Sequence, residues 1–282
     1  MARDRRGEIS RRRREPAKIN DSAIVWQGLS ALNGQPTVAI VTGISGRSAN
    51  PKTGPMAQLY ILCSDVDPLT AVRTGQDKTI CGDCGYRGTS AVIDGEIVHG
   101  KNRGCYVTVA HAPRNIYATY ARDRYAFVEP STVSARLGRL RVPLRLGAYG
   151  DPAALPLNVI AELVDRVPRW TGYTHAWRSR PDLAPYVMAS CDSPLDHAAA
   201  TAAGFRVFRA RLKDAPLLDG EIACPASEEM QYRSSCDRCS LCNGSAGPAD
   251  RRRNIAIIVH GSTTVHAVAF LRSKPTTAMV AL

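Results

Sequence analysis

The chain has 282 residues, of which 44% are hydrophobic, so it is long enough to form one large domain or two small ones. No apolar run approaches the roughly 18 residues of a membrane-spanning helix, which excludes integral membrane proteins built from helices. The first 20 residues, MARDRRGEISRRRREPAKIN, lack the apolar segment of a secretory signal, so we expect a cytoplasmic protein without structural disulfides.

After this start, short apolar segments alternate with amphipathic ones. Strands are expected at residues 37–43, 57–63, 105–110, 142–152, 170–177, 185–193, 205–211, 220–225 and 254–261. Helices are expected at residues 113–125, 155–167 and 194–204. Alternating strands and helices predict parallel strands joined by crossovers. We therefore expect an α/β fold of the TIM-type (β/α) barrel, regular or irregular, with inserted metal-binding knuckles; a doubly wound sheet is the alternative.

The net charge of +12 and the isoelectric point of about 9.5 favour a polyanionic partner, most simply nucleic acid. Arginines are concentrated in the first 14 residues and recur at 136–145 and 251–253. The composition bias of a GC-rich genome is the alternative explanation. We expect residues 1–20 to form a disordered basic arm and residues 21–282 to form a single catalytic barrel domain.

Polar residues stand at the ends of five expected strands: Asp151, His175, Asp192, Cys224 and His260. In a barrel, catalytic groups lie at the C-terminal ends of the strands, so these residues are candidates for catalysis or ligand binding. Solvated loop residues are the alternative. Candidates for holding a substrate base are His175 and the nearby aromatic residues Tyr149, Tyr173 and Trp177. Aromatic residues at such positions also often belong to the core.

Four of the nine cysteines lie between residues 224 and 242. Cys236, Cys239 and Cys242 form a C-x2-C-x2-C run, and thiolates three residues apart on a tight turn can face one ion. Cys224 or His260 would be the fourth ligand. Such a set binds Zn²⁺, and four thiolates also accept a 4Fe-4S cluster. We therefore expect a metal site within residues 224–260, with free buried thiols as the alternative.

Cys81, Cys84 and Cys105 form a second candidate metal site, because Cys81 and Cys84 are separated by two residues in a glycine-rich turn. The fourth ligand would be His99, His111 or Cys63. The two cysteine groups can also share one site. The C-x3-C-x2-C run of radical enzymes that cleave S-adenosylmethionine is absent from the sequence.

Acidic residues at strand ends beside a basic surface favour chemistry on nucleic acid, such as base exchange at a sugar carbon. This reaction needs one carboxylate as nucleophile and a second for proton transfer. Asp151 and Asp192 are the first candidates. Asp65 and Asp67 are a further acidic pair, although Asp67 followed by Pro68 is also typical of a helix start.

Several segments resemble a family of phage-encoded, cysteine-rich proteins. They are ICGDC (80–84), CYV (105–107), RLGAYGDPAALP (145–156), WTGYTHAWR (170–178), MASCDS (188–193) and CPAS (224–227) followed by C-x2-C-x2-C. Through them the chain resembles the viral, DNA-acting branch of the tRNA-guanine transglycosylase superfamily, which inserts 7-deazaguanine bases into phage DNA. The resemblance covers residues from about 50 to 262.

This resemblance implies a TIM barrel, two catalytic aspartates and zinc held by three cysteines and a histidine. Asp192 would be the nucleophile, and Asp151 or Asp65 would handle protons. The zinc ligands would be Cys236, Cys239, Cys242 and His260. The implied partners are DNA and a free modified base, in the cytoplasm of a bacteriophage host. The chain departs from the family in its cysteine spacing, since the familiar enzymes have C-x-C-x2-C, and in its early cysteines, which the resemblance does not explain.

We therefore expect a DNA guanine transglycosylase of the phage type. Two other functions remain open. An Fe–S enzyme, of the radical type or another, would act on a nucleotide or a small molecule. A non-catalytic zinc protein would only bind nucleic acid.

Overall fold

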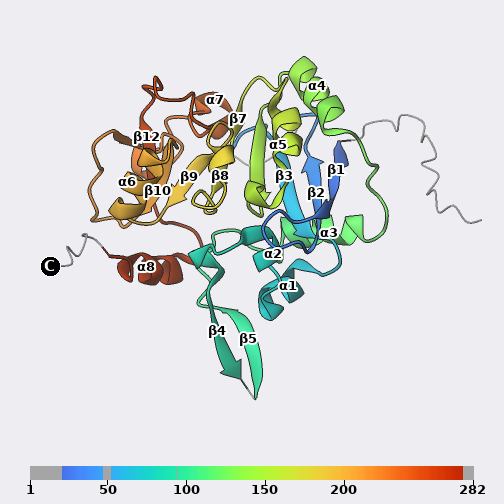
Figure 1. Cartoon of the computed structure of the whole chain (residues 1–282), viewed down its shortest axis with the longest axis horizontal. Coiled ribbons are helices and arrows are strands. Elements are labelled where there is room, and N and C mark those ends of the chain that lie inside the picture. The colour runs from blue at the N-terminus through green and yellow to red at the C-terminus, as the bar shows by residue number, and fades with distance from the viewer. Residues whose placement is uncertain (1–20, 47–51, 94, 276–282) are drawn as a thin grey trace, which may run out of the picture.

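The computed structural model describes residues 21–46, 52–93 and 95–275. The expected basic arm at residues 1–20 lies outside the described residues. Two five-stranded sheets form the centre of the molecule, and a separate two-stranded hairpin projects from it (Figure 1).

The first sheet mixes antiparallel and parallel strands. Its strands in spatial order are β1 (Ser22–Leu29), β2 (Pro36–Thr42), β3 (Ala57–Cys63), β6 (Leu144–Tyr149) and β7 (Trp170–Thr171). The pairs β1–β2 and β2–β3 are antiparallel, and β3–β6 and β6–β7 are parallel. β2 has an almost unbroken buried run because strands flank it on both sides and both of its faces are covered.

The second sheet is parallel throughout. Its strands in spatial order are β11 (Glu221–Ala223), β12 (Asn254–Ile258), β10 (Val207–Arg211), β9 (Met188–Cys191) and β8 (Tyr173–Thr174). The last strand in the sequence, β12, lies between β10 and β11. This order differs from the sequential order of a regular TIM barrel.

Gly172 joins the two sheets, because it alone separates β7 from β8. Its carbonyl accepts the N–H of Met188 at 3.0 Å, and its own N–H donates to the carbonyl of Cys242 at 2.8 Å. In the described part of the chain, β1 and β11 each pair with a single neighbouring strand, so this pairing closes no barrel. The described residues form a mixed α/β structure. A closed barrel remains a prediction.

Helices pack against both sheets. They are α1 (Pro68–Thr74), α2 (Lys78–Cys81), α3 (Ala112–Tyr120), α4 (Pro130–Leu140), α5 (Leu157–Val164), α6 (Pro194–Ala202), α7 (Cys236–Cys239) and α8 (Thr264–Arg272). α2 and α3 contact β3, α6 contacts β9 and β10, and α8 contacts the 3₁₀ turn η1 (Gly85–Arg87). Short 3₁₀ turns also occur at η2 (Pro152–Ala154), η3 (Pro181–Leu183) and η4 (Glu228–Met230).

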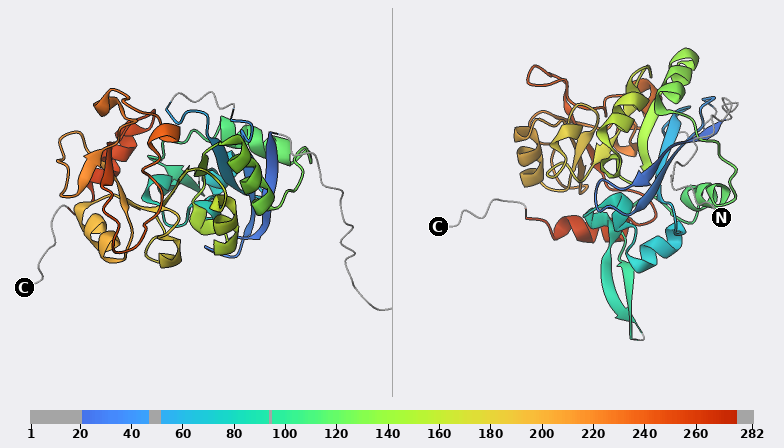
Figure 2. Two further views of the ribbon diagram at one scale, coloured as in Figure 1. Left: turned by 90° about the horizontal axis from the view of Figure 1, so that it is seen from above. Right: turned by 45° about the vertical axis from the view of Figure 1, so that its right-hand side comes forward.

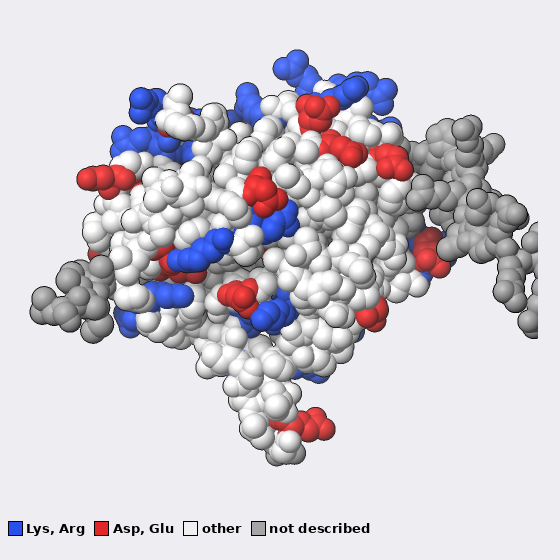
Figure 3. Space-filling model, in the orientation of Figure 1, with Lys and Arg blue, Asp and Glu red and all other residues white. Residues whose placement is uncertain are grey.

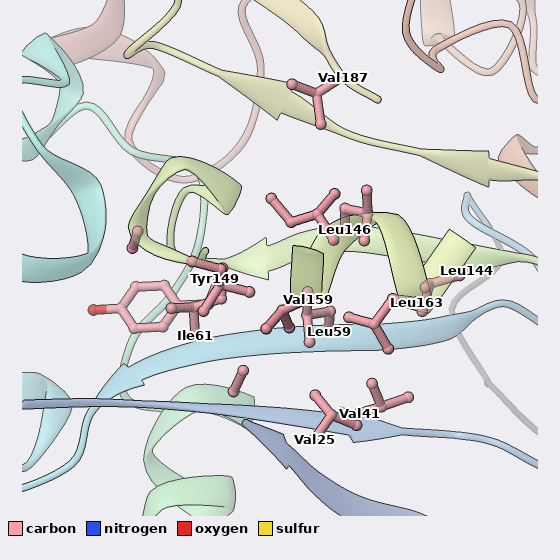
Figure 4. Close-up of a cluster of buried hydrophobic side chains, with 14 of the residues drawn as sticks. Val25, Val41, Leu59, Ile61, Leu144, Leu146, Tyr149, Val159, Leu163 and Val187 are labelled. Atoms are coloured by element: carbon pink, nitrogen blue, oxygen red, sulfur yellow. The ribbon is translucent and has the colours of Figure 1, made fainter. Parts of the chain in front are cut away.

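The main core lies between the first sheet and α5 (Figure 4). Leu59 and Leu146 from the sheet and Leu163 from the helix are all fully buried. Burying each such side chain contributes about 1.5–3 kcal/mol. This packing fixes the start of β6 and β7, and through Gly172 it fixes β8, whose end carries His175.

The hairpin of β4 (Thr89–Ile93) and β5 (Glu96–Lys101) projects away from both sheets in Figure 1 and Figure 2. Its apolar residues Val92 and Ile97 are 71% and 66% exposed.

The prediction of a strand at residues 105–110 is wrong, because this segment is an irregular loop. The N–H groups of Gly104 and Cys105 both donate to the carbonyl of Tyr86, so the segment binds a turn instead of a sheet edge.

Over residues 21–46, 52–93 and 95–275, no helix combines the length and the hydrophobicity that crossing a bilayer demands.

Candidate functional site

A small polar pocket opens at the C-terminal ends of β8 and β9. We call it the Asp192 pocket, and its lining residues are Asp83, Gly85, His175, Trp177, Arg178, Ser190, Asp192, Asp196 and Lys274. Its volume is about 120 Å³, small beside the roughly 300–1,000 Å³ of clefts that hold drug-sized ligands. The pocket therefore suits one small group, such as a nucleobase.

Asp192 and His175 face each other in this pocket. Nε2 of His175 lies 3.7 Å from Oδ2 of Asp192, and the two side chains are 24% and 8% exposed. This separation suits an ion pair and is too long for a good hydrogen bond. Oδ1 of Asp192 and Nε2 of His175 are both buried without a hydrogen bond of good geometry, although the Tyr86 hydroxyl lies beside the Asp192 carboxylate. Such atoms are costly to bury, and they are available to a ligand.

The charges of neighbouring groups act on the His175 ring. Burial alone lowers the pKa of His175, but the neighbouring Cys84 thiol and the Asp192 carboxylate outweigh burial and hold the pKa well above its usual value. Tyr86 closes the same region, with its ring edge-on to the His175 ring at a centroid distance of 5.8 Å.

Asp151 lies behind this pocket and is used by the backbone. Its Oδ1 accepts the N–H of Ala153 at 2.9 Å, and its Oδ2 accepts the N–H of His175 at 2.8 Å. Burial raises the pKa of Asp151, and these hydrogen bonds oppose the rise. Oδ1 therefore caps η2 and Oδ2 positions the residue after β8, and Asp151 is not among the residues that line the Asp192 pocket.

The other acidic candidates lie elsewhere. Asp65 lines a separate hollow of about 270 Å³ together with Cys63 and Thr79. Asp67 caps α1, since its carboxylate accepts the N–H groups of Leu69 and Thr70, which confirms the interpretation of Asp67 as a helix start. The structure does not place either residue in the lining of the Asp192 pocket.

The three aromatic candidates separate into different environments. Trp177 is 4% exposed and lines the Asp192 pocket, with the Arg178 guanidinium stacked 3.8 Å from its ring centroid. Tyr173 packs on Phe208 at a centroid distance of 4.4 Å and its hydroxyl meets Cys242. Tyr149 is 2% exposed and belongs to the main core at the end of β6 (Figure 4).

The late cysteines all lie in the segment that connects β11 to β12. We call Cys224, Cys236, Cys239 and Cys242 the late thiol group. Cys224 N–H donates to the carbonyl of Ala256 at 2.8 Å, and Cys236 N–H donates to the carbonyl of Lys52 at 3.1 Å. With the bond from Gly172 to Cys242, these contacts fasten the loop to β12, to the segment before β3 and to the junction of the sheets.

The thiols of this group affect one another. Burial and, to a smaller extent, the charges of Cys236 and Cys239 raise the pKa of Cys224 to about 11, against the opposing effects of the Ala226 N–H and the Lys52 charge. Burial likewise raises the pKa of Cys242, to which the charges of the other three thiols add. Two cations oppose these effects at Cys236, namely Arg145 and Lys52. Cations beside clustered thiols favour the thiolate form, which is the form that binds metal.

His260 is committed to other contacts. Its Nε2 lies 2.6 Å from Nζ of Lys52, and its Nδ1 lies 2.9 Å from the carbonyl oxygen of Ile258. Its ring stacks with Tyr106, whose hydroxyl accepts a hydrogen bond from Arg145. Of the two candidates for the fourth ligand, the geometry therefore favours Cys224.

The early cysteines meet beside the Asp192 pocket. We call Cys81, Cys84 and Cys105 the early thiol group. Burial raises the pKa of Cys81, and the charges of Asp77, Cys84 and Cys105 add to this effect. The three residues considered as a fourth ligand contact other groups or lie at the surface: His99 contacts Ser90, Cys63 donates to Gln76, and His111 is exposed before α3.

Across the described ranges, no three His, Cys, Asp or Glu side chains are already close enough together to coordinate one ion. Metal binding at either thiol group therefore requires the thiols to turn toward a common centre.

No family model matches this chain, and no curated protein or solved structure matches it. The site is therefore interpreted from its own geometry.

Sequence reasoning missed several pocket residues. Asp83, Arg178, Asp196 and Lys274 line the Asp192 pocket. Asp83 and Arg178 stand beside residues that were singled out, Cys84 and Trp177, and so carried a local signal. Lys274 follows the end of α8, far in sequence from the other residues of the pocket. No local sequence pattern therefore indicates that it lines the pocket.

Proposed function

We propose that the protein is a DNA base-exchange enzyme of the guanine transglycosylase type, with Asp192 as its nucleophile. The observation that carries this proposal is the buried, unpartnered Oδ1 of Asp192 in a base-sized pocket at a strand end. A carboxylate in such a place is shielded from water and free to attack an electrophile.

The reaction takes place in two displacements at the sugar carbon C1′. In the first, Oδ1 of Asp192 forms a bond to C1′, and the glycosidic C1′–N9 bond breaks. Its electron pair leaves with guanine, which takes up a proton at the base. In the second, a ring nitrogen of the incoming 7-deazaguanine loses its proton and attacks C1′, and the electron pair of the ester bond returns to Asp192.

Proton transfer needs a second carboxyl group in the same pocket, and Asp83 is available there. Asp83 lines the pocket, and its carboxylate is exposed and paired with Lys78 at 2.9 Å. Asp196 is less suited as a proton donor, because hydrogen bonds from Arg178 and Ser193 outweigh the effect of burial and lower its pKa. Asp151 positions the backbone of His175, and Asp65 lies in the other hollow.

Recognition of DNA draws on flat and basic groups around the pocket. The Arg178 plane, stacked on Trp177, offers a surface on which an unstacked base can lie. Lys274 lines the pocket and can contact a phosphate. Lys and Arg side chains also gather along the upper edge of the face in Figure 3, including the part over α4, where Arg139 and Arg141 are exposed.

The late thiol group is proposed to hold Zn²⁺, with a 4Fe-4S cluster as the alternative. Its donors fit either group, because four thiols share one loop and Arg145 and Lys52 offset their negative charge. The metal would fix the loop from 224 to 242 against the junction of the sheets. In this proposal the partners are DNA and a free modified base, in the cytoplasm of a bacteriophage host.

The test is incorporation of radiolabelled guanine or 7-deazaguanine into duplex DNA by the purified chain. The wild-type chain is expected to incorporate label. Asp192→Asn is expected to lose at least about 1,000-fold in rate, because the amide is a poor nucleophile. Asp165→Asn, on an exposed side chain paired with Arg166, is the matched control and should retain activity. Equal incorporation by wild type and Asp192→Asn would refute the assignment.

A further inference from the structure

Buried polar atoms without partners are concentrated around the early thiol group. Of nine such side-chain atoms in the described part of the chain, six belong to Tyr86, Arg103, Tyr149, His175 and Asp192. Each unpaired buried atom costs about 1–3 kcal/mol, and native proteins contain few of them. Their gathering in one place indicates a bound group that these residues surround.

Backbone contacts hold the three thiols of this group in one region. The N–H of Cys84 donates to the carbonyl of Cys81 at 3.2 Å, which closes the turn between the two cysteines. The N–H of Cys105 donates to the carbonyl of Tyr86 at 3.0 Å, which brings the third cysteine to the same turn. Such a turn can present both of its thiols to one side.

His175 joins this region from the end of β8. Its ring contacts the Tyr86 ring, and it shares the Asp192 pocket with Gly85, which follows Cys84. The side chains of His175 and Cys84 are in contact, and Cys105 lies within range of the charge on His175. Three thiols and one imidazole are thus neighbours, although His175 lies 70 residues beyond Cys105 in the sequence.

We propose that the early thiol group and His175 together bind one divalent cation of the zinc class. Three thiolates and an imidazole are a set that zinc prefers in tetrahedral sites. Asp192 lies beside Nε2 of His175, which leaves Nδ1 of the ring for the metal. A carboxylate on the far nitrogen of a metal-binding histidine fixes the ring and its tautomer.

The charges of the site agree with this assignment. Three thiolates and a divalent cation carry one net negative charge, and Arg103 lies beside the group. Its guanidinium pairs with Asp77 at 3.2 Å through one nitrogen, and two other nitrogens are buried without a partner. Burial lowers the pKa of Arg103, but the charges of neighbouring groups, Cys105 and Cys81 first among them, outweigh burial and raise it. Arg103 can therefore neutralise the metal–thiolate group.

The site would also hold Asp192 in place, since Oδ2 faces the metal-bound histidine while Oδ1 remains unpartnered. The metal site does not depend on base exchange, because its occupancy is measured without DNA. Its failure and the failure of the proposed function are therefore distinguishable.

The experiment uses the full chain with Cys236→Ser and Cys239→Ser, which disable the late thiol group, and Co²⁺ as the probe. About one Co²⁺ per chain is expected, with a thiolate-to-cobalt charge-transfer band and the visible bands of a tetrahedral ion. Adding His175→Cys supplies a fourth thiolate, so the charge-transfer band should grow by about a third at unchanged stoichiometry. An unfolded chain would not give this increase.

Adding Cys84→Ser should weaken Co²⁺ binding, whereas Cys191→Ala, which removes a core thiol, should leave the spectrum unchanged. If the double-serine chain does not fold, the unaltered chain should bind one ion more than its Cys84→Ser variant. Absence of Co²⁺, a spectrum that is insensitive to both His175→Cys and Cys84→Ser, or iron with sulfide at these residues would overturn the proposal.

Discussion

Tyr173 and His175 lie two residues apart, because Tyr173 begins the two-residue strand β8 and His175 directly follows it. Tyr173 meets Cys242 of the late thiol group, and His175 meets Cys84 of the early one. One short strand therefore connects both thiol groups with Asp192. A change in either group can reach the pocket through this strand.

The late thiol group predicts a metal content that depends on particular cysteines. Cys236→Ser should reduce the zinc or iron bound per chain, because it removes one of the four thiols that share the loop. Cys191→Ala is the control, since Cys191 is a fully buried thiol of the core outside both groups. Elemental analysis of both purified variants checks this. Equal metal content in the two variants would show that the late thiol group does not bind the metal.

Gly244 predicts a steric effect on the same loop. A Cβ at this position would overlap the backbone of Pro185 and Tyr186, which cannot move as a side-chain end can. Gly244→Ala should therefore displace the segment after Cys242, lower the free energy of unfolding by about 1–3 kcal/mol and weaken metal binding.

The matched control for this substitution is Gly247→Ala. Gly247 has a φ of +91° and open space around its Cβ position, so alanine there meets backbone strain alone. Its cost should be about 1–2 kcal/mol without loss of metal. Urea denaturation and metal titration measure both effects. Retained metal affinity in Gly244→Ala would show that the contact with residues 185–186 does not position Cys242.

Asp151 predicts a loss of stability. In Asp151→Asn, the amide NH₂ would face one of the two N–H donors that the carboxylate accepts, those of Ala153 and His175. The free energy of unfolding should fall by about 1–3 kcal/mol. Label incorporation should remain measurable in the folded fraction. Complete loss of incorporation with unchanged stability would instead make Asp151 a catalytic residue.

Glu221 and Arg209 form a buried ion pair with separations of 2.7 and 2.6 Å, and their side chains are 0% and 4% exposed. Removing one partner leaves a buried charge, so Glu221→Ala should cost about 3–5 kcal/mol. Asp165→Asn, in an exposed pair, should cost less than about 1 kcal/mol. Equal costs in urea denaturation would contradict this prediction.

The same pair predicts a pH dependence. Burial tends to raise the pKa of Glu221, but hydrogen bonds from Arg209 outweigh it and lower the pKa below its usual value. The stabilisation is therefore present above pH about 4.3, the usual value for glutamate, and is lost as the pH falls toward the lower folded-state pKa. Glu221→Gln should lose this part of the acid sensitivity, measured as unfolding free energy against pH. An unchanged slope would contradict it.

Much of the second sheet could be predicted from the sequence, because its strands are short apolar runs. Helix α6, which packs on this sheet, could also be predicted, since it begins at Pro194 and ends near Gly204. The strand order could not be predicted from local patterns. Strand β12 lies between β10 and β11, and this placement depends on contacts between residues far apart in sequence. Strand β1, helix α4 and helix α8 were also not predicted.

The candidate site was predictable in part. Spacing indicated that Cys236, Cys239 and Cys242 belong to one short segment, and their shared metal site stays a prediction. It did not indicate that His175 would meet Cys84, because this contact depends on how the turn before η1 packs on β8. Asp151 resembled a catalytic acid in sequence, and only the backbone contacts show how its oxygens are used.

The most direct test of the central claim is mass spectrometry of nucleosides from DNA of cells that express either the wild-type chain or Asp192→Asn, with the 7-deazaguanine base supplied. The account predicts a deoxynucleoside of the 7-deazaguanine base in wild-type cells and its absence with Asp192→Asn at equal protein level. An unmodified deoxyguanosine pool with both chains, or equal modification with both, would contradict it.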